Sequence, residues 1–137
     1  MIAEAGIGDE ADVVALWHAC ELTRPWNNPE ADFRRALATS TATVLVFWIG
    51  GAIKGSVMAG FDGHRGWIYY LAVAPVHRRS GHATALLEAA TDWLRSQGCP
   101  KVELMVRAGN EQAAALYRKL GWEKQPVDVY GIWTEKN

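Results

Sequence analysis

The sequence predicts a mixed α/β domain of the α+β type, with helices packed on a central, mostly antiparallel sheet. Its length of 137 residues suits one domain over residues 1–137. Half of the residues are apolar and 21% are charged, a balance that supports a buried core and excludes a disordered chain. Segments with helical spacing alternate with runs rich in β-branched and aromatic residues. Together these segments predict a sheet of six to seven strands and about four helices.

The N-terminal part of the chain predicts one short strand followed by two helices. Residues 1–5 fit the strand, and Asp9 is a suitable N-cap for a helix that runs to about Ala19. Apolar residues recur along that helix at helical spacing: Val13, Leu16, Trp17 and Cys20. Two prolines then interrupt the chain within residues 24–29, and the second can begin a helix over residues 30–38.

Three strands joined by tight turns are expected next. The run over residues 43–49 is apolar and rich in β-branched and aromatic side chains, and the Gly50-Gly51 pair after it signals a hairpin. A second strand is expected over residues 52–61 and a third over residues 67–73, separated by the turn at residues 62–66. Strands that follow one another this closely predict an antiparallel meander.

The second half of the chain alternates helices and strands. Pro75 ends the third strand of the meander, and a loop over residues 77–83 leads into a helix over residues 84–96, which Gly98 stops. Because a helix crosses between them, the following strand over residues 101–106 is predicted to run parallel to its predecessor. The remaining elements are a helix from its N-cap Asn110 to Leu120 and one or two closing strands from Trp122, including residues 127–133.

Charge and cysteine content exclude several classes of partner. Lys and Arg total 14 and Asp and Glu total 15, so the net charge of −1 provides no broad positive field for nucleic acid or anionic membranes. Cys20 and Cys99 lie far apart without metal-ligand spacing, which predicts no metal site and reduced thiols in a cytoplasmic protein. Residues 1–12 do not resemble a signal peptide, and no apolar run approaches the roughly 20 residues of a membrane span.

The stretch from Leu71 to Ala83 predicts an anion site. It runs from a strand through a glycine-containing loop into an amphipathic helix. Such a junction directs unpaired backbone N–H groups at one point, and the helix dipole adds partial positive charge, which suits phosphates. Gly81 and Ala83 are small enough for close approach, and Arg78 and Arg79 add charge. Alone, the stretch fits an ordinary helix cap with two solvated arginines equally well.

A second stretch, residues 110–122, contains a capped helix with a tyrosine on its apolar stripe. Asn110 occupies the N-cap position, and Tyr117 lies on the same stripe as Leu116 and Leu120. An inward-facing tyrosine needs a polar partner for its hydroxyl. Alone, Tyr117 fits a core tyrosine and Asn110 fits an ordinary cap.

Together and in this order, the two stretches resemble motifs of the GCN5-related N-acetyltransferase (GNAT) family. The first matches the family's acetyl-CoA loop as Arg78-x-x-Gly81-x-Ala83, and the second is similar to its Asn-x-x-Ala-x-x-x-Tyr-x-x-x-Gly-[Phe/Trp] element. The resemblance covers residues 43–122 well, and residues 24–27 with residues 60–66 resemble the small bacterial YpeA-type acetyltransferases. It implies the GNAT acyl-CoA N-acyltransferase fold, with a sheet splayed between its fourth and fifth strands.

The resemblance also implies how the chain would bind acetyl-CoA. The loop would hold the pyrophosphate, the splayed strand would pair with the pantetheine arm, and a strand amide would face the acetyl oxygen. The positions that the family pattern assigns to the cofactor are Leu71, Ala72, Val73, Arg78, Arg79, Ser80, Gly81, His82, Ala83, Thr84, Asn110 and Tyr117. Tyr117 would also act as general acid, since a tyrosine with a pKa of about 10 stays protonated near neutral pH.

For the general base and the acceptor site, the resemblance provides only candidate residues. Many family members carry a glutamate where this chain has tyrosines, of which Tyr70 is a candidate for ordering a proton-carrying water. Glu103 is a candidate catalytic base or substrate anchor, with a solvated strand-end charge as the alternative. Trp26, Asn27 and His64 are candidates for contacts with the acceptor; a loop anchor and a solvent-facing turn histidine are the alternatives for Trp26 and His64.

The sequence therefore predicts an N-acetyltransferase that uses acetyl-CoA as cosubstrate and acetylates a primary amine by direct attack through a tetrahedral intermediate. The acceptor is a small molecule or a peptide or protein amine, and the residues do not select among these. A catalytically silent acyl-CoA-binding module is the alternative, which the missing strand glutamate favours, and a partner-binding scaffold is a third interpretation. The protein is expected to be a monomer or a homodimer.

Overall fold

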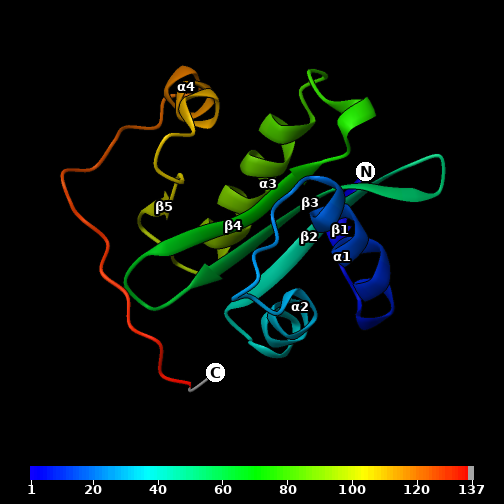
Figure 1. Cartoon of the computed structure of the whole chain (residues 1–137), viewed down its shortest axis with the longest axis horizontal. Coiled ribbons are helices and arrows are strands. Elements are labelled where there is room, and N and C mark those ends of the chain that lie inside the picture. The colour runs from blue at the N-terminus through cyan, green and yellow to red at the C-terminus, as the bar shows by residue number, and fades with distance from the viewer. Residues whose placement is uncertain (136–137) are drawn as a thin grey trace. The chain divides into compact units, whose positions relative to one another are not determined.

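The computed structural model describes residues 1–135, which form one five-stranded sheet and four α-helices (Figure 1). The strands are β1 (Ile2–Glu4), β2 (Ala42–Ile49), β3 (Ala52–Phe61), β4 (Gly66–Val73) and β5 (Val102–Leu104). The helices are α1 (Glu10–Ala19), α2 (Pro29–Ala38), α3 (His82–Ser96) and α4 (Glu111–Lys119), with the 3-10 turns η1 (Ile7–Asp9) and η2 (Pro75–His77). The chain divides into two compact units: residues 1–105 contain the whole sheet with α1 to α3, and residues 106–137 contain α4.

The sheet has the mixed pattern that the sequence predicts. Its strands lie in the order β1-β2-β3-β4-β5, and every neighbouring pair is antiparallel except β4 and β5, which are parallel. The meander of β2, β3 and β4 and the parallel crossover through α3 are therefore confirmed.

The predicted number of six to seven strands is wrong, because the described residues form five. The segment over residues 127–133 was the expected source of the closing strands. It has no ladder partner within residues 1–135, and its Val127, Val129 and Tyr130 side chains are exposed. Apolar alternation favours a strand, but a strand exists only where a neighbour completes its backbone hydrogen bonds.

Local signals explain where the first two helices begin. Pro29 occupies the first turn of α2, and the side-chain oxygen of Asn28 accepts a hydrogen bond from the Ala31 N–H at 3.0 Å. Asp9 stands at the N-cap of α1 as predicted, but its carboxylate accepts the Gly6 N–H at 2.8 Å instead of capping the helix. Both helices nevertheless lie within one residue of their predicted bounds.

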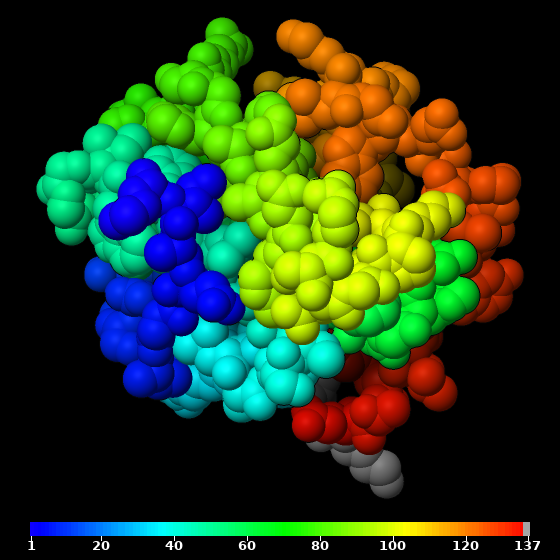
Figure 2. All heavy atoms as spheres, turned by 180° about the vertical axis from the view of Figure 1, so that it is seen from behind, coloured from blue at the N-terminus to red at the C-terminus, as the bar shows by residue number. Residues whose placement is uncertain are grey.

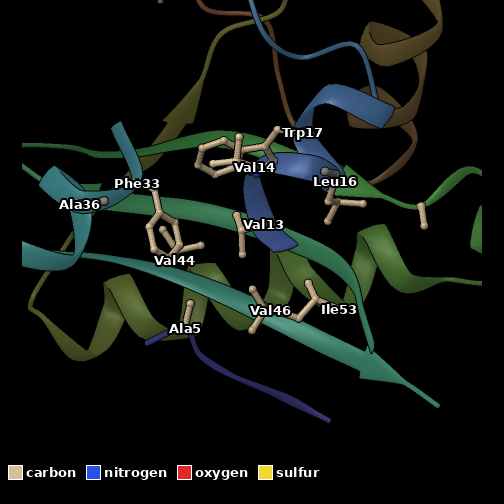
Figure 3. Packing of buried hydrophobic residues seen from close by; sticks show 12 residues of the cluster. Ala5, Val13, Val14, Leu16, Trp17, Phe33, Ala36, Val44, Val46 and Ile53 are labelled. Atoms are coloured by element: carbon tan, nitrogen blue, oxygen red, sulfur yellow. The ribbon is translucent and has the colours of Figure 1, made fainter. Parts of the chain in front are cut away.

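Helices cover both faces of the sheet in the first unit. On one face, α1 and α2 bury Trp17 and Phe33 against residues such as Val46 (Figure 3). The other face carries α3, which lies in front in Figure 2 and contacts Phe47 through His82. Adjacent residues of a strand point to opposite faces, so β2 contributes to both cores. The buried side chains of α3 are Leu86, Leu87, Ala90 and Leu94.

Gly55 on β3 leaves no room for a side chain. A Cβ at this position would overlap the ring of Phe47, which is buried and stacks on His82 with ring centroids 4.6 Å apart. Because Phe47 is buried and packed against His82, we expect Gly55→Ala to lower the free energy of unfolding by about 1–3 kcal/mol, the usual cost of overpacking a core. Denaturant unfolding measures this change.

Gly60 on the same strand provides the matched control. A Cβ there would meet its nearest atom, the Cβ of Ala42, at an ordinary 3.7 Å. Gly60→Ala should therefore shift the free energy of unfolding by no more than about 0.5 kcal/mol. Equal losses in the two variants would show that the Phe47 contact is not the cause.

Candidate functional site

Strands β4 and β5 separate part-way along their length. The two strands pair only where Gly66–Ile68 of β4 lies beside β5, and Tyr69–Val73 has no β5 partner. The Ala74 N–H donates to the Lys54 carbonyl of the β3 side at 2.8 Å. Because polar groups alternate along a strand, those of Val73 face away from β3, toward the open side. The predicted splay between the fourth and fifth strands is confirmed.

A bulge in β4 lies at the point where the strands separate. The register between β3 and β4 shifts there, so that Tyr70 and Leu71 together lie opposite Val57. Tyr70 has a φ of +52°, in the left-handed region that residues with a Cβ disfavour. A bulge bends its strand and redirects the groups that follow it. The backbone of β4 is therefore redirected at Tyr70.

The Tyr70 residue is held from three sides. Its ring stacks on Trp17 with centroids 3.8 Å apart and planes 7° from parallel. Its carbonyl accepts a hydrogen bond from the Ser56 hydroxyl at 3.3 Å, and its own hydroxyl donates to Oδ2 of Asp32 at 2.7 Å. The indole N–H of Trp17 donates to Ser56 Oγ at 2.9 Å and completes the network. Burial and the hydrogen-bonded Asp32 carboxylate raise the pKa of the Tyr70 hydroxyl far above its usual value, so it stays protonated.

The sequence did not predict the hydrogen-bond partner of the Tyr70 hydroxyl. Tyr70 was expected to order a water, whereas its hydroxyl is bonded to Asp32, which lies 38 positions earlier in the chain. In the sequence, Asp32 fits an acidic residue that complements the dipole in the first turn of a helix. No local pattern links this aspartate to β4, because only the packing of α2 on the sheet brings them together.

The loop between β4 and α3 presents a row of backbone donors. Arg79 and Gly81 adopt positive φ angles of +63° and +79°, and Gly81 is the N-cap of α3. The helix begins its hydrogen bonding with the Ala85 N–H, which donates to the Gly81 carbonyl at 3.0 Å. Within residues 1–135, the N–H groups from Arg79 to Thr84 have no hydrogen-bond acceptor. Open donors at the positive end of a helix dipole can bind an anion.

The charged and aromatic side chains of this loop point in different directions. Arg78 turns back to the strand, where its Nε–H donates to the Val73 carbonyl at 3.0 Å. The Cys20 thiol donates to the same carbonyl at 3.3 Å. Arg79 is exposed, whereas the half-buried His82 stacks on Phe47. Both arginines that the sequence offers as anion ligands are exposed, but Arg78 is hydrogen-bonded to the strand, and Arg79 stands beside the open donors.

In the second unit, α4 carries the two remaining predicted residues. The Asn110 side-chain oxygen accepts the Ala113 N–H at 3.1 Å, which confirms Asn110 as the N-cap. Tyr117 lies two turns along the helix and is half-buried, with its ring edge against Trp122 at 6.0 Å. Burial raises the pKa of the Tyr117 hydroxyl, so the group stays protonated at neutral and mildly alkaline pH.

Comparison with known proteins identifies the family. A family model described as the acetyltransferase (GNAT) family matches residues 12–122. The chain belongs to the GNAT acetyltransferase family. A protein named as an acetyltransferase in Yersinia enterocolitica is 45% identical over 123 residues, which are 90% of this chain and 87% of that protein. The chain is therefore an N-acetyltransferase, similar to small bacterial members of the GNAT family.

Solved structures of GNAT enzymes share the fold. The apo aminoglycoside 6'-N-acetyltransferase AAC(6')-IG from Acinetobacter haemolyticus superposes with a TM-score of 0.80 at 23% identity, covering 99% of each chain. AAC(6')-Iy, in complex with the bisubstrate analogue CoA-S-monomethyl-acetylneamine, superposes with a TM-score of 0.83 at 17% identity, covering 97% of each chain. At these identities the likeness shows the GNAT fold and not the acceptor.

The other candidate residues of this GNAT chain lie apart from the bulge. Glu103 is opposite Trp67 in the paired part of β4 and β5, and its carboxylate lies 3.3 Å from Nε of Arg65. His64 is exposed in the turn after β3, and its backbone N–H donates to the Asp62 carboxylate at 2.8 Å. Hydrogen bonds from the Arg65 and His64 backbone N–H groups lower the pKa of Asp62. Glu103 is thus an ion-paired carboxylate that is only 18% exposed, and His64 is an exposed turn residue.

Trp26 and Asn27, the other predicted acceptor contacts, lie in the segment between α1 and α2. Both residues are exposed, Trp26 by 51%. A large aromatic side chain that remains this accessible can contact a ligand. Across residues 1–135, no cluster of three or more His, Cys, Asp or Glu side chains could hold a metal ion, and no helix is long and apolar enough to cross a membrane.

Proposed function

We propose that this enzyme transfers the acetyl group of acetyl-CoA to a primary amine of a small molecule or a peptide. The observation that carries the proposal is the combination, within one unit, of six backbone donors without acceptors and a strand that has left its neighbour. The first feature suits a diphosphate, and the second suits an extended arm that hydrogen-bonds like a strand. Pyrophosphate and pantetheine are the corresponding parts of CoA.

The loop binds the pyrophosphate through its main chain in this proposal. The N–H groups from Arg79 to Thr84 donate to the phosphate oxygens, and the α3 dipole adds to the attraction. Gly81 permits close approach, because an added Cβ there would meet no protein atom within 4 Å and would instead occupy the space for the ligand. Arg79, exposed beside these donors, supplies positive charge.

The open part of β4 positions the reactive end. Val73 faces the open side and, with Leu71, pairs with the pantetheine arm. An amide near Ala72 or Val73 donates to the acetyl oxygen, where negative charge develops during attack. A donor that is fixed before the reaction needs no reorganisation during it, which is why the redirected backbone after the bulge matters.

Acetyl-CoA supplies an activated acetyl group as a thioester. The acceptor nitrogen forms a bond to the carbonyl carbon and loses a proton, and the carbon–sulfur bond breaks as the thiolate leaves. Tyr117 gives its proton to that sulfur, and its raised pKa keeps the proton available. Asn110 contacts the pantetheine arm, and Glu103 is the candidate acceptor of the amine's proton. Tyr70, hydrogen-bonded to Asp32, acts indirectly, because it sets the direction of the β4 backbone that follows it.

The acceptor site is assigned to Trp26, Asn27 and His64, which are exposed in the α1–α2 segment and the β3–β4 turn. Two structural relatives are named as aminoglycoside acetyltransferases, so polyamine-like sugars belong in the set of acceptors to test. The enzyme acts as a monomer or a homodimer. Cys20 and Cys99 are free thiols, in keeping with a cytoplasmic enzyme.

Release of free CoA tests the proposal. The purified protein is incubated with acetyl-CoA and a panel of amino acids, amino sugars, polyamines and peptides, and thiol release is followed with a colorimetric reagent. We expect amine-dependent release, with the acetylated product detected by mass spectrometry. Binding of CoA by calorimetry without turnover would favour the silent acyl-CoA-binding module, and absence of CoA binding at millimolar concentration would refute both.

A further inference from the structure

We propose that Asp32 is a positioning residue that acts through Tyr70 to fix the β4 bulge. This inference rests on the proposed acetyl transfer. It adds to the proposed active site a residue of α2, which lies outside the β4–α3 loop and the separated strands β4 and β5. Its basis is the hydrogen bond of 2.7 Å from the Tyr70 hydroxyl to Asp32 Oδ2. A positioning residue does not touch the reacting atoms; it determines where another group holds them.

The bulge needs such support because its backbone is strained. Tyr70, with a φ of +52°, is one of three non-glycine residues with a positive φ among the described residues. Side chains with a Cβ disfavour this region, so a tyrosine persists there only when its surroundings over-determine its conformation. The contacts of Tyr70 must therefore outweigh a local preference for ordinary strand geometry.

Two of the three contacts belong to the buried core. Trp17 is fully buried and packs edge-on against Phe33 (Figure 3), and the Ser56 hydroxyl that bonds the Tyr70 carbonyl is also fully buried. The third contact comes from the side chain of Asp32, which is 28% exposed. Asp32 can be changed without opening the core, so its contribution is open to measurement.

The position of the bulge indicates which step it affects. Tyr70 immediately precedes Leu71–Val73, the stretch without a β5 partner that is assigned to the thioester end, whereas the proposed phosphate donors begin at Arg79. If the ring loses its anchor, the following amides change direction while the phosphate loop remains unaltered. Misplacement of reacting groups by about 1 Å can cost about a hundredfold in rate. The expected effect is therefore larger on kcat than on affinity for CoA, because the phosphate loop keeps its geometry.

The competing role for Asp32 is a direct ion pair with the ammonium of the acceptor. The charged group that faces Asp32 in the structure is Arg35, with Nη1 3.4 Å from Oδ1. Asparagine separates the two roles, because its side-chain oxygen still accepts a hydrogen bond from a hydroxyl but carries no charge. Alanine removes both functions. Arg35→Gln removes the neighbouring cation and is the matched control.

The experiment compares Asp32→Asn, Asp32→Ala and Arg35→Gln in steady-state kinetics, with thermal unfolding to verify the fold. We expect kcat to fall about thirtyfold in Asp32→Ala and to stay within about threefold in Asp32→Asn and Arg35→Gln, with KM for acetyl-CoA changed by no more than about threefold in any variant. Equal losses in Asp32→Asn and Asp32→Ala would overturn the proposal in favour of an ammonium anchor. Wild-type rates in all three variants would overturn it as well.

A second measurement is independent of turnover. In the ligand-free protein, the backbone amide resonances of Leu71 and Ala72 should shift in Asp32→Ala and coincide with wild type in Asp32→Asn. If the wild-type protein acetylates no amine, the proposed function fails while these spectra still decide whether Asp32 sets the bulge. Unshifted amides in a folded Asp32→Ala would refute the positioning role.

Discussion

In Tyr117→Phe, kcat for acetyl transfer is expected to fall about hundredfold, within the range of about 10²–10⁴ that general acid catalysis provides. Phenylalanine keeps the half-buried ring and its edge contact with Trp122 but removes the proton that leaves with the thiolate. The KM for acetyl-CoA should change little, since the proposed phosphate donors are in the loop before α3. Thiol release at saturating acetyl-CoA measures this effect.

Two comparisons make this prediction specific. Tyr130→Phe alters an exposed tyrosine of the same unit and should leave kcat unchanged. Because burial raises the pKa of Tyr117, wild-type kcat should show no loss from tyrosine ionisation up to at least the ordinary tyrosine pKa of about 10. A rate for Tyr117→Phe within about twofold of wild type would remove Tyr117 from the mechanism.

In Gly81→Val, the affinity for CoA is expected to fall about hundredfold, which corresponds to about 2.7 kcal/mol. Gly81 has a φ of +79°, a conformation in which a β-branched residue is a strong outlier, so the loop would leave the geometry that aligns its donors. The added methyl groups would also occupy the side from which the phosphates approach, where no protein atom lies within 4 Å of a Cβ. Calorimetric titration with CoA measures the change.

The matched control is Gly63→Val in the β3–β4 turn. Gly63 also has a positive φ, +94°, and a Cβ added there would likewise meet no protein atom within 4 Å. Both variants therefore carry the cost of a valine in a left-handed conformation and should lose similar thermal stability. Only Gly81→Val should lose affinity for CoA. Similar affinities in both variants would mean that the loop is not the phosphate site.

The sequence was sufficient for features that depend on local chemistry. Gly50 and Gly51 adopt positive φ angles at the hairpin that they were expected to form, and Pro29 and Asn110 mark helix starts where predicted. The loop that leads from β4 into α3 could be predicted because its strand–glycine–helix pattern lies within one short stretch. These signals depend only on residues that are adjacent in the sequence, so a single sequence is enough to recognise them.

Features that depend on distant partners could not be predicted in the same way. The strand expected over residues 127–133 needed an edge to pair with, and the segment forms none within the described residues. The Asp32–Tyr70 hydrogen bond depends on the packing of α2 against the sheet. The left-handed backbone of Tyr70 also departs from local preference. Such departures from local rules concentrate at functional positions.

In the proposed mode of cofactor binding, the hydrogen bonds of the Val73 carbonyl have a consequence for how coenzyme enters. It already accepts hydrogen bonds from Arg78 Nε and from the Cys20 thiol, and a carbonyl oxygen has two lone pairs. A pantetheine amide that bonds this oxygen must therefore displace a resident donor, so docking is an exchange of partners and not a simple addition. If the pantetheine amide displaces Arg78, its guanidinium becomes available to the phosphates. Binding of the pantetheine arm would then strengthen binding of the pyrophosphate.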